Sequence, residues 1–164
     1  MSLEMEPAGA ESPFRVKANA VTLGESGVLI RGDSGAGKST LALSLVDAWR
    51  RQGDFARLVG DDCIMVRIKG GRALLSPHQS IAGLAEWRGI GLLKQEYEQC
   101  AVLALIVDLE SDQARADCPR LPDATELCCD FHGLRDIPLL RLSARETERS
   151  VAAIMAFLHK LSAK

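Results

Sequence analysis

The sequence predicts an α/β domain with a central mixed sheet, an N-terminal hairpin and flanking helices. Residues 32–39 read Gly-Asp-Ser-Gly-Ala-Gly-Lys-Ser, a glycine-rich loop between an apolar run and an amphipathic stretch. Residues 101–109 are almost all apolar, as in a strand that is buried on both faces. Apolar residues at 151, 154, 155, 158 and 161 follow the period of an amphipathic C-terminal helix. Together these patterns indicate strands and helices that pack into one layered domain.

Turn residues and apolar periodicity predict the elements of the first half of the chain. The sequence Gly-Glu-Ser-Gly at residues 24–27 separates two apolar runs and indicates a hairpin turn. Residues 39–49 carry a helical apolar stripe that stops before Gly53. The expected elements are a hairpin of residues 21–23 and 28–31, a helix over 39–49, a strand over 57–60 and a second hairpin of 63–68 and 72–75.

The second half is predicted to hold fewer regular elements. Residues 77–93 contain scattered glycines and no sustained period, which indicates loops with a short helix or strand. Residues 112–130 are polar and contain proline, which indicates a loop and a short helix. After the buried strand over 101–109, we expect one more strand over 137–142 before the C-terminal helix.

Composition and charge narrow the class of protein. A length of 164 residues suits one domain, and 47% hydrophobic with 26% charged residues is ordinary for a globular protein. The net charge of −2 gives no electrostatic reason to expect nucleic acid or a membrane surface as partner. No apolar run reaches the roughly 18–20 residues that span a bilayer. Residues 1–12 carry acids and no export signal, so we take them as a leader or tail and residues 13–164 as the P-loop domain.

The cysteines indicate a reducing environment. Their odd number, 5, favours free thiols over a disulfide framework, so we expect the protein in the cytoplasm. Cys118, Cys128 and Cys129 lie close together in the sequence with His132 nearby, but their spacing matches no common zinc pattern. We predict no metal site there and no catalytic role for any of the three histidines.

The glycine-rich loop is the strongest functional signal in the chain. It fits G-x-x-x-x-G-K-[ST] at every position, and its glycines let successive backbone N–H groups face an anion. The helix that begins near Lys38 adds the positive end of its dipole. Lys38 is expected to bridge the β- and γ-phosphates, and the Ser39 hydroxyl to ligate Mg²⁺. The residues predicted to bind ATP are Gly32, Asp33, Ser34, Gly35, Ala36, Gly37, Lys38, Ser39 and Thr40.

A phosphate-binding loop needs a carboxylate nearby to hold or orient the metal, and often a second one to accept a proton. Two stretches of the sequence supply such carboxylates. Asp61 and Asp62 follow a short apolar strand, where a parallel sheet would bring them beside the loop. We expect this pair to serve the metal and to accept a proton, and both aspartates stay candidates for the base. Glu86 and Arg88 precede two glycines, a pattern that suits a metal ligand and a phosphate clamp on one flexible loop.

Taken together, the three stretches resemble the catalytic domain of HPr kinase/phosphorylase. That bacterial enzyme phosphorylates a serine of the phosphocarrier protein HPr and can also remove the phosphate. In the family the loop typically reads GDSGxGKS, an aspartate pair follows an L-V-A-D-D-like run, and a signature close to E-V-R-G-L-G-I comes next. The same order is found here at residues 32–39, 58–62 and 86–92. The likeness covers residues 15–110 well and the rest loosely, and it resembles short α-proteobacterial members without the N-terminal regulatory domain.

The resemblance implies a fold of the HPr kinase type, ATP and Mg²⁺ as cofactors, and an HPr-like phosphocarrier as the protein substrate. It also implies a ring-like homo-oligomer, a hexamer in that family. The predicted catalytic residues are Lys38, Asp61, Asp62 and Arg88. The predicted metal ligands are Ser39, Asp61 and Glu86.

Three places depart from the family pattern. Lys17 stands where the family usually has a histidine, which argues against the phosphorylase reaction. Thr40 follows the loop serine in place of a glutamate. An arginine-rich segment near the C-terminus corresponds here to residues 140–145, where Arg141 and Arg145 are both candidates for the family's arginine.

The leading hypothesis is an ATP-dependent protein-serine kinase that acts on an HPr-like phosphocarrier and regulates carbohydrate metabolism through the phosphotransferase system. Two alternatives stay open. One is a P-loop kinase for a small metabolite, because the loop does not identify the acceptor. The other is a non-catalytic ATP-sensing module, because the expected histidine is missing.

Overall fold

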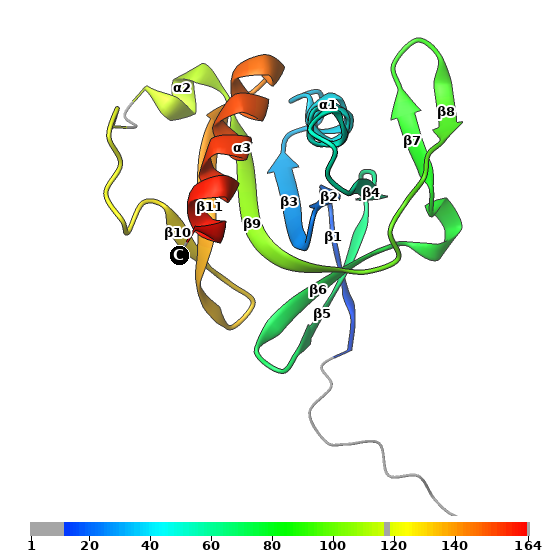
Figure 1. Ribbon diagram of the computed structural model, residues 1–164, viewed down its shortest axis with the longest axis horizontal. Coiled ribbons are helices and arrows are strands. Elements are labelled where there is room, and N and C mark those ends of the chain that lie inside the picture. Colours follow the sequence, from blue (N-terminus) through cyan, green and yellow to red (C-terminus); the bar gives the residue numbers. More distant parts are fainter. Residues whose placement is uncertain (1–11, 117–118, 164) are drawn as a thin grey trace, which may run out of the picture.

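The computed structural model describes residues 12–116 and 119–163, so the expected leader lies outside the described residues except for Ser12. The chain forms a long curved sheet with two helices packed on one face (Figure 1). The helices are α1 (Lys38–Arg51), α2 (Asp112–Arg115) and α3 (Thr147–Ser162), with a short 3-10 turn at Gln79–Ile81. The strands are β1 (Phe14–Val16), β2 (Asn19–Leu23), β3 (Ser26–Gly32), β4 (Ala56–Gly60), β5 (Ile64–Lys69), β6 (Arg72–Pro77), β7 (Leu84–Trp87), β8 (Gly91–Lys94), β9 (Ala101–Glu110), β10 (Cys128–Phe131) and β11 (Leu134–Ser143).

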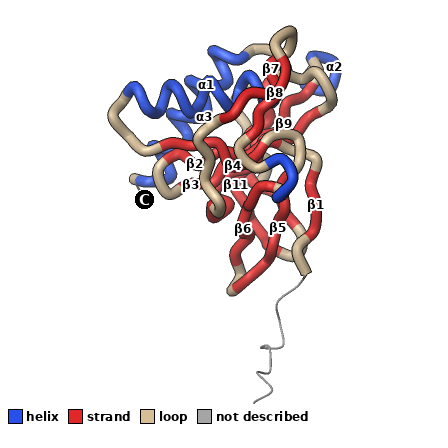
Figure 2. The backbone as a smooth tube through the Cα atoms, turned by 90° about the vertical axis from the view of Figure 1, so that its right-hand side faces the viewer, coloured by secondary structure: helices blue, strands red, loops and turns tan. Residues whose placement is uncertain are grey.

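The central sheet is mixed, as predicted. Its strands follow the order β1-β5-β6-β9-β3-β2-β4, and β11 pairs with β9 and β10. β9 runs parallel to β3 and to β11, whereas the other pairs are antiparallel. β9 contacts β6 at its first two residues and β11 over its last five, so the sheet branches along this strand. Figure 2 shows the β5–β6 hairpin extending away from the helices.

Two apolar cores hold the sheet, one on each face. On the first face, α1 and α3 pack over β3 and β9, with the fully buried Leu45 and Ile154 among the contacts. On the second face, the sheet curls over itself, so that Val66 and Leu75 of the β5–β6 hairpin pack against Ile106 of β9. The alternation of these side chains along each strand assigns successive residues to opposite cores.

An ion pair joins β3 to β9 one residue before the glycine-rich loop begins. Arg31 donates from Nε to Asp108 Oδ1 at 2.7 Å and from Nη2 to Oδ2 at 2.8 Å. The side chains are 33% and 23% exposed, so the pair is partly shielded from water. The hydrogen bonds from Arg31 to Asp108 raise the pKa of Arg31 above its ordinary value. This two-pronged contact fixes the register of the two parallel strands at the edge where the loop starts.

The expected elements are present, with bounds shifted by a few residues, and four strands extend the predicted set. The expectation that residues 128–130 lie in a loop was wrong, because Cys128–Phe131 pairs with β11. β1 was not expected, and residues 77–93 hold one strand of a hairpin, β7, and the start of the other, β8, in addition to the short helical turn. Each of these strands has three or four residues, which is too short to show a period in the sequence.

Candidate active site

The glycine-rich loop connects the end of β3 to the start of α1, as the sequence predicted. Gly37 caps the helix in the left-handed region with φ 94°, a conformation that glycine adopts without the steric cost a side chain brings. No side chain caps this helix end, so its first N–H groups face the loop interior. Lys38 is buried, and its Nζ donates to the backbone carbonyls of Gly32 at 2.8 Å and Asp33 at 2.9 Å. The loop therefore presents N–H groups and one held ammonium to the same space.

Asp61 is the buried hub beneath this loop. Its Oδ1 accepts the Ser39 hydroxyl at 2.7 Å and an N–H of the Asn19 amide. Its Oδ2 accepts the backbone N–H of Glu86 at 2.7 Å. One carboxylate thus connects the start of α1, the start of β2 and the strand β7 that carries Glu86.

Asp62 is placed differently, although it is the next residue. It has a positive φ of 59°, and Cys63 N–H donates to the Asp61 carbonyl at 2.8 Å across a tight turn. The turn directs Asp62 into the open cavity, where its carboxylate is exposed, whereas Asp61 is 6% exposed. The backbone N–H of Asp62 donates to Asn19 Oδ1 at 3.2 Å. The two aspartates therefore have separate surroundings and can have separate roles.

A cavity of about 490 Å³ lies over the loop and collects most of the predicted site residues. This volume is within the usual range for a small-molecule site. Its lining residues are Lys17, Ser34, Gly35, Gly37, Lys38, Ser39, Thr40, Asp62, Glu86, Arg88, Arg145 and Thr147. Four cationic side chains and two carboxylates in one cavity match the charge of a polyphosphate bound with a divalent cation.

The remaining predicted residues do not line the cavity. Gly32, Asp33 and Ala36 belong to the loop but do not line the space. Gly32 lies so close to β9 that an added Cβ would be 2.9 Å from the carbonyl oxygen of Leu109. Asp61 is also absent from the wall because Ser39 and Glu86 stand between it and the cavity.

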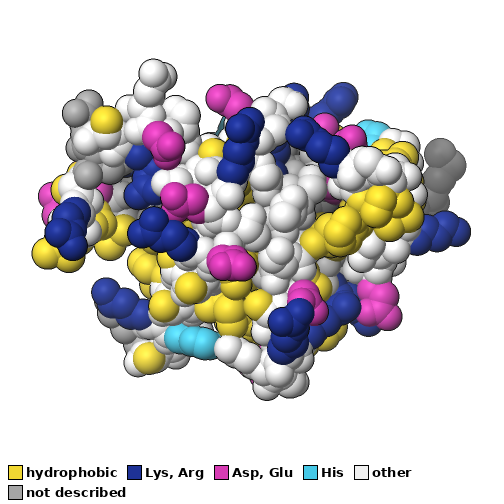
Figure 3. Space-filling view, turned by 90° about the horizontal axis from the view of Figure 1, so that it is seen from above, with side chains coloured by type: hydrophobic (Ala, Val, Ile, Leu, Met, Phe, Trp, Pro, Cys, Tyr) yellow, Lys and Arg dark blue, Asp and Glu magenta, His cyan; other side chains and the backbone are white. Residues whose placement is uncertain are grey.

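Glu86 and Arg88 reach the cavity from a hairpin, not from an irregular loop. β7 pairs with β8 so that Trp87 faces Gly91, and Ile90 N–H donates to the Trp87 carbonyl at 2.9 Å across the turn. Ile90 and Leu92 on this hairpin are 70% and 65% exposed. Figure 3, seen from above, shows basic side chains across this side of the molecule and an apolar patch at the right, over the hairpin.

The structure also distinguishes the two candidate arginines. Arg145 donates from Nε to the Gly35 carbonyl at 3.1 Å and from its backbone N–H to the Ala36 carbonyl at 3.0 Å. Arg141 lies elsewhere, with its Nε 3.5 Å from Glu110 Oε1 on the strand pair β9–β11. Arg145 is therefore the arginine that reaches the phosphate loop.

The sequence did not indicate Asn19 or Thr147 as site residues. It named Arg145 only as one of two candidate arginines. Asn19 has a signal in hindsight, since it is the one amide in an otherwise apolar stretch, residues 18–21. That position gains meaning only through strand register, because Asn19 pairs with Ile30 near the end of β3.

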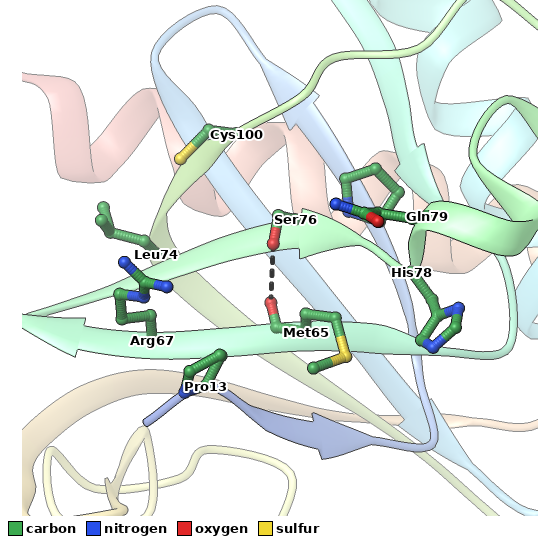
Figure 4. A pocket seen from close by; sticks show the side chains of 9 residues that line it. Pro13, Met65, Arg67, Leu74, Ser76, His78, Gln79 and Cys100 are labelled. Carbon is green, nitrogen blue, oxygen red and sulfur yellow. Dashed lines mark hydrogen bonds between the residues drawn. The ribbon is translucent and has the colours of Figure 1, made fainter. Parts of the chain in front are cut away.

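A second hollow, of about 450 Å³, lies on the outer face of the β5–β6 hairpin, at some distance from the loop (Figure 4). It is lined by side chains such as Arg67, His78 and Cys100, and none of the predicted site residues lines it. Cys118 of the cysteine group lies outside the described residues. Within residues 12–116 and 119–163, no helix is long and apolar enough to cross a membrane.

Comparisons with known proteins agree with this geometry. The sequence profile of the family described as HPr Serine kinase C-terminal domain matches residues 12–160. The chain is 35% identical over 137 residues to the HPr kinase/phosphorylase of Streptococcus pyogenes serotype M1, which covers 79% of this chain and 41% of that protein. It is 40% identical over 92 residues to the HPr kinase/phosphorylase of Geobacillus thermodenitrificans, which covers 51% and 28%.

A solved structure matches most of the fold. The HPr(Ser) kinase/phosphatase from Coxiella burnetii gives a TM-score of 0.70 at 22% identity, over 91% of this chain and 92% of that one. This match confirms the predicted fold class. The chain spans less than half of the length of the two curated relatives named above.

Proposed function

Because the chain belongs to the family of HPr Serine kinase C-terminal domains, we propose that it transfers the γ-phosphoryl group of ATP to a serine of an HPr-like phosphocarrier protein. The observation that carries this proposal is the cavity that Lys38 of the phosphate loop, Asp62 and Arg88 line together. A carboxylate that can act as base, an ammonium and a guanidinium in one space are the parts that phosphoryl transfer needs.

The loop and its basic neighbours would bind the triphosphate. The N–H groups at the start of α1 and the Lys38 ammonium would contact the β- and γ-phosphates. Arg145 is anchored to the Gly35 carbonyl through Nε, which leaves its terminal nitrogens available for a phosphate. Arg88 would contact the transferred group from the opposite hairpin.

The residues around Ser39 fit a Mg²⁺ ion that binds together with the nucleotide. Mg²⁺ usually keeps several waters and takes one or two carboxylates plus substrate phosphates. The described residues contain no group of three or more His, Cys, Asp or Glu that could hold a metal ion, so substrate phosphates would have to complete the shell. The Ser39 hydroxyl and the Glu86 carboxylate would hold the ion, and Asp61 would orient the Ser39 hydroxyl by accepting its proton. When bound, the ion would neutralise charge on the phosphates.

Asp62 is the residue that we assign as the base. The acceptor serine Oγ attacks the γ-phosphorus while the bond to the bridging oxygen breaks, ADP leaves with that oxygen, and the serine proton passes to Asp62. Asp61 is unsuited to this role because its oxygens already accept three hydrogen bonds within the protein. Lys17 lines the same cavity at the position where the family usually has a histidine, which argues against the phosphorylase reaction.

We further propose for this protein a cytoplasmic location, a homo-oligomer of the hexameric kind and a role in regulating carbohydrate metabolism, on the strength of the family match alone. Residues 13–164 would form its kinase domain.

The test is transfer of label from γ-labelled ATP, with Mg²⁺, to a panel of serine-containing phosphocarrier proteins. We expect transfer by the unsubstituted chain and none by Lys38→Ala. No transfer under any metal condition, although MgATP binds, would overturn the kinase assignment and support the ATP-sensing alternative. Equal nucleotide affinity in Lys38→Ala would refute the role of the loop.

A further inference from the structure

Asn19 is the one buried amide beside the candidate active site. It is 1% exposed and stands at the first position of β2. Its Nδ2 donates to Ser39 Oγ at 3.2 Å and also to Asp61 Oδ1, and its Oδ1 accepts the Asp62 N–H at 3.2 Å. The Asn19 side chain thus contacts the Ser39 hydroxyl, which is the expected metal ligand, the buried Asp61 carboxylate and the backbone of Asp62, the proposed base.

The topology of the sheet places Asn19 at this junction. β3 and β4 both run antiparallel to β2, which lies between them, so both end at the edge where β2 begins. The loop of Ser39 follows β3, and the two aspartates follow β4. The first residue of β2 is therefore the natural bridge between the two groups.

The hydrogen-bond inventory leaves the Ser39 hydroxyl with one free direction. A serine hydroxyl has one proton and two lone pairs. The proton is donated to Asp61 at 2.7 Å, and one lone pair accepts the Asn19 amide N–H. The second lone pair is left for the cavity that Ser39 lines. Without Asn19 the hydroxyl could turn, since one fixed bond permits rotation about it.

We infer that Asn19 is a positioning residue that holds the Ser39 hydroxyl with its free lone pair toward the Mg²⁺ of a bound Mg-nucleotide. It acts through Ser39 and Asp61 and touches neither the nucleotide nor the ion. Partners that orient metal ligands typically change metal affinity by about 10–100-fold when they are removed. This inference rests on the nucleotide-binding part of the proposed function. It assigns to Asn19 the orientation of the metal-binding hydroxyl.

The experiment measures nucleotide affinity by calorimetry with Mg²⁺ and with excess chelator, for ADP and for a non-hydrolysable ATP analogue. The ratio of the two dissociation constants reports the coupling between metal and nucleotide. Four chains are compared with the unsubstituted one: Asn19→Ala, Ser39→Ala, the double variant and Thr22→Val. Thr22 is the matched control, because it is buried on the same strand and donates to the Gly24 carbonyl at 3.0 Å, away from the site.

We expect Asn19→Ala to lower the Mg²⁺ coupling by about tenfold or more, and to leave affinity in chelator within about twofold. The double variant should lose no more coupling than Ser39→Ala alone, because both substitutions remove the same oriented hydroxyl. Thr22→Val should keep the coupling. Additive losses in the double variant, equal losses with and without Mg²⁺, or a loss in Thr22→Val as large as in Asn19→Ala would overturn the inference.

A second variant guards against a folding defect at a buried position. Asn19→Thr suits a strand and keeps one hydroxyl donor in place of two N–H donors. It should fold and still lose coupling, and full coupling in this variant would contradict the positioning role. Absence of Mg²⁺-dependent binding in the unsubstituted chain would refute the inference as well. The kinase proposal is judged separately, by transfer to a phosphocarrier, so MgATP binding with the expected coupling but without transfer would defeat only that proposal.

Discussion

Replacing Asp61 or Asp62 by asparagine should have different effects, although the two residues are adjacent. One change should affect phosphoryl transfer, and the other should affect stability and nucleotide binding. Asp62→Asn removes the proposed base and leaves the buried contacts intact, so transfer should fall by about 10²–10⁴-fold with little change in MgATP affinity. Asp61→Asn replaces one carboxylate oxygen by an NH2 group, which faces either the Glu86 N–H or the Ser39 and Asn19 donors, so it should cost about 1–3 kcal/mol of stability and weaken MgATP binding.

The measurement is a pair of assays on both variants, with single-turnover transfer for the chemistry and chemical denaturation for stability. Ser76→Ala serves as a control, since Ser76 lies on the distant β6 strand and bonds only the Met65 carbonyl at 3.4 Å. Retained transfer in Asp62→Asn would remove the base assignment from that residue.

The Cys129 thiol should make the free energy of unfolding depend on pH in the alkaline range. Burial raises the pKa of this thiol above its ordinary value. The folded protein therefore keeps the thiol protonated at pH values where the unfolded chain has already ionised it. Unfolding then releases a proton, so the free energy of unfolding falls as pH rises through the ordinary thiol range, and it does not change on this account at neutral pH.

Denaturant unfolding of the unsubstituted chain and of Cys129→Ala, from pH 7 to alkaline pH, checks this sign. The unsubstituted chain should lose more stability over the range, because the variant lacks the thiol. A larger loss in Cys129→Ala would contradict the direction of the pKa shift. Alkylation at neutral pH should also be slower at Cys129 than at the exposed Cys100.

At the scale of elements, the connection from β11 to α3 supports the phosphate loop from the side. Arg145 supplies two of its contacts, the Nε bond to Gly35 and the backbone bond to Ala36. Arg145→Ala keeps the backbone bond and loses the guanidinium, so nucleotide affinity should fall by about 10–100-fold, as for one or two charge-assisted hydrogen bonds. Arg141→Ala is the matched control on β11 and should leave affinity unchanged, since Arg141 lies beside Glu110 instead.

Titration of the nucleotide into both arginine variants separates these outcomes. A loss in Arg141→Ala equal to that in Arg145→Ala would mean that general surface charge, rather than contact with the loop, sets the affinity.

The elements that the sequence predicted are those whose pattern is local. The helix from Lys38 follows a glycine-rich turn and carries a regular apolar stripe, and the run at β9 is continuous. β10 could not be predicted in this way, because its four residues form a strand only by pairing with β11. The loop residues, Asp62 and Glu86 were found through short motifs, whereas Asn19 and Arg145 reach the site through strand order and a distant connection. The sequence carries no signal that places Asn19 at the site and does not distinguish Arg145 from Arg141.

At the scale of the whole molecule, nucleotide binding should raise the Tm of the protein. A ligand at 100 times its dissociation constant adds about 2.7 kcal/mol to the folded state. For a chain of this size that corresponds to a rise in Tm of roughly 5–10 °C. Lys38→Ala should show no rise with MgATP, and a scan of Tm against nucleotide concentration is the measurement. An equal rise in Lys38→Ala would locate the binding elsewhere in the molecule.

The position of β9 also has a consequence for how the protein is made. β3 leads into the phosphate loop, yet its second neighbour in the sheet, β9, begins at Ala101, about 70 residues further along the chain. During synthesis at about 5–20 residues per second, one edge of β3 stays unpaired for several seconds, with apolar residues such as Leu29 beside it. A nascent chain that stalls during this interval exposes an unpaired apolar strand edge, which is prone to aggregation and to chaperone binding. The nucleotide loop is thus translated well before β9, the strand that completes the support of β3.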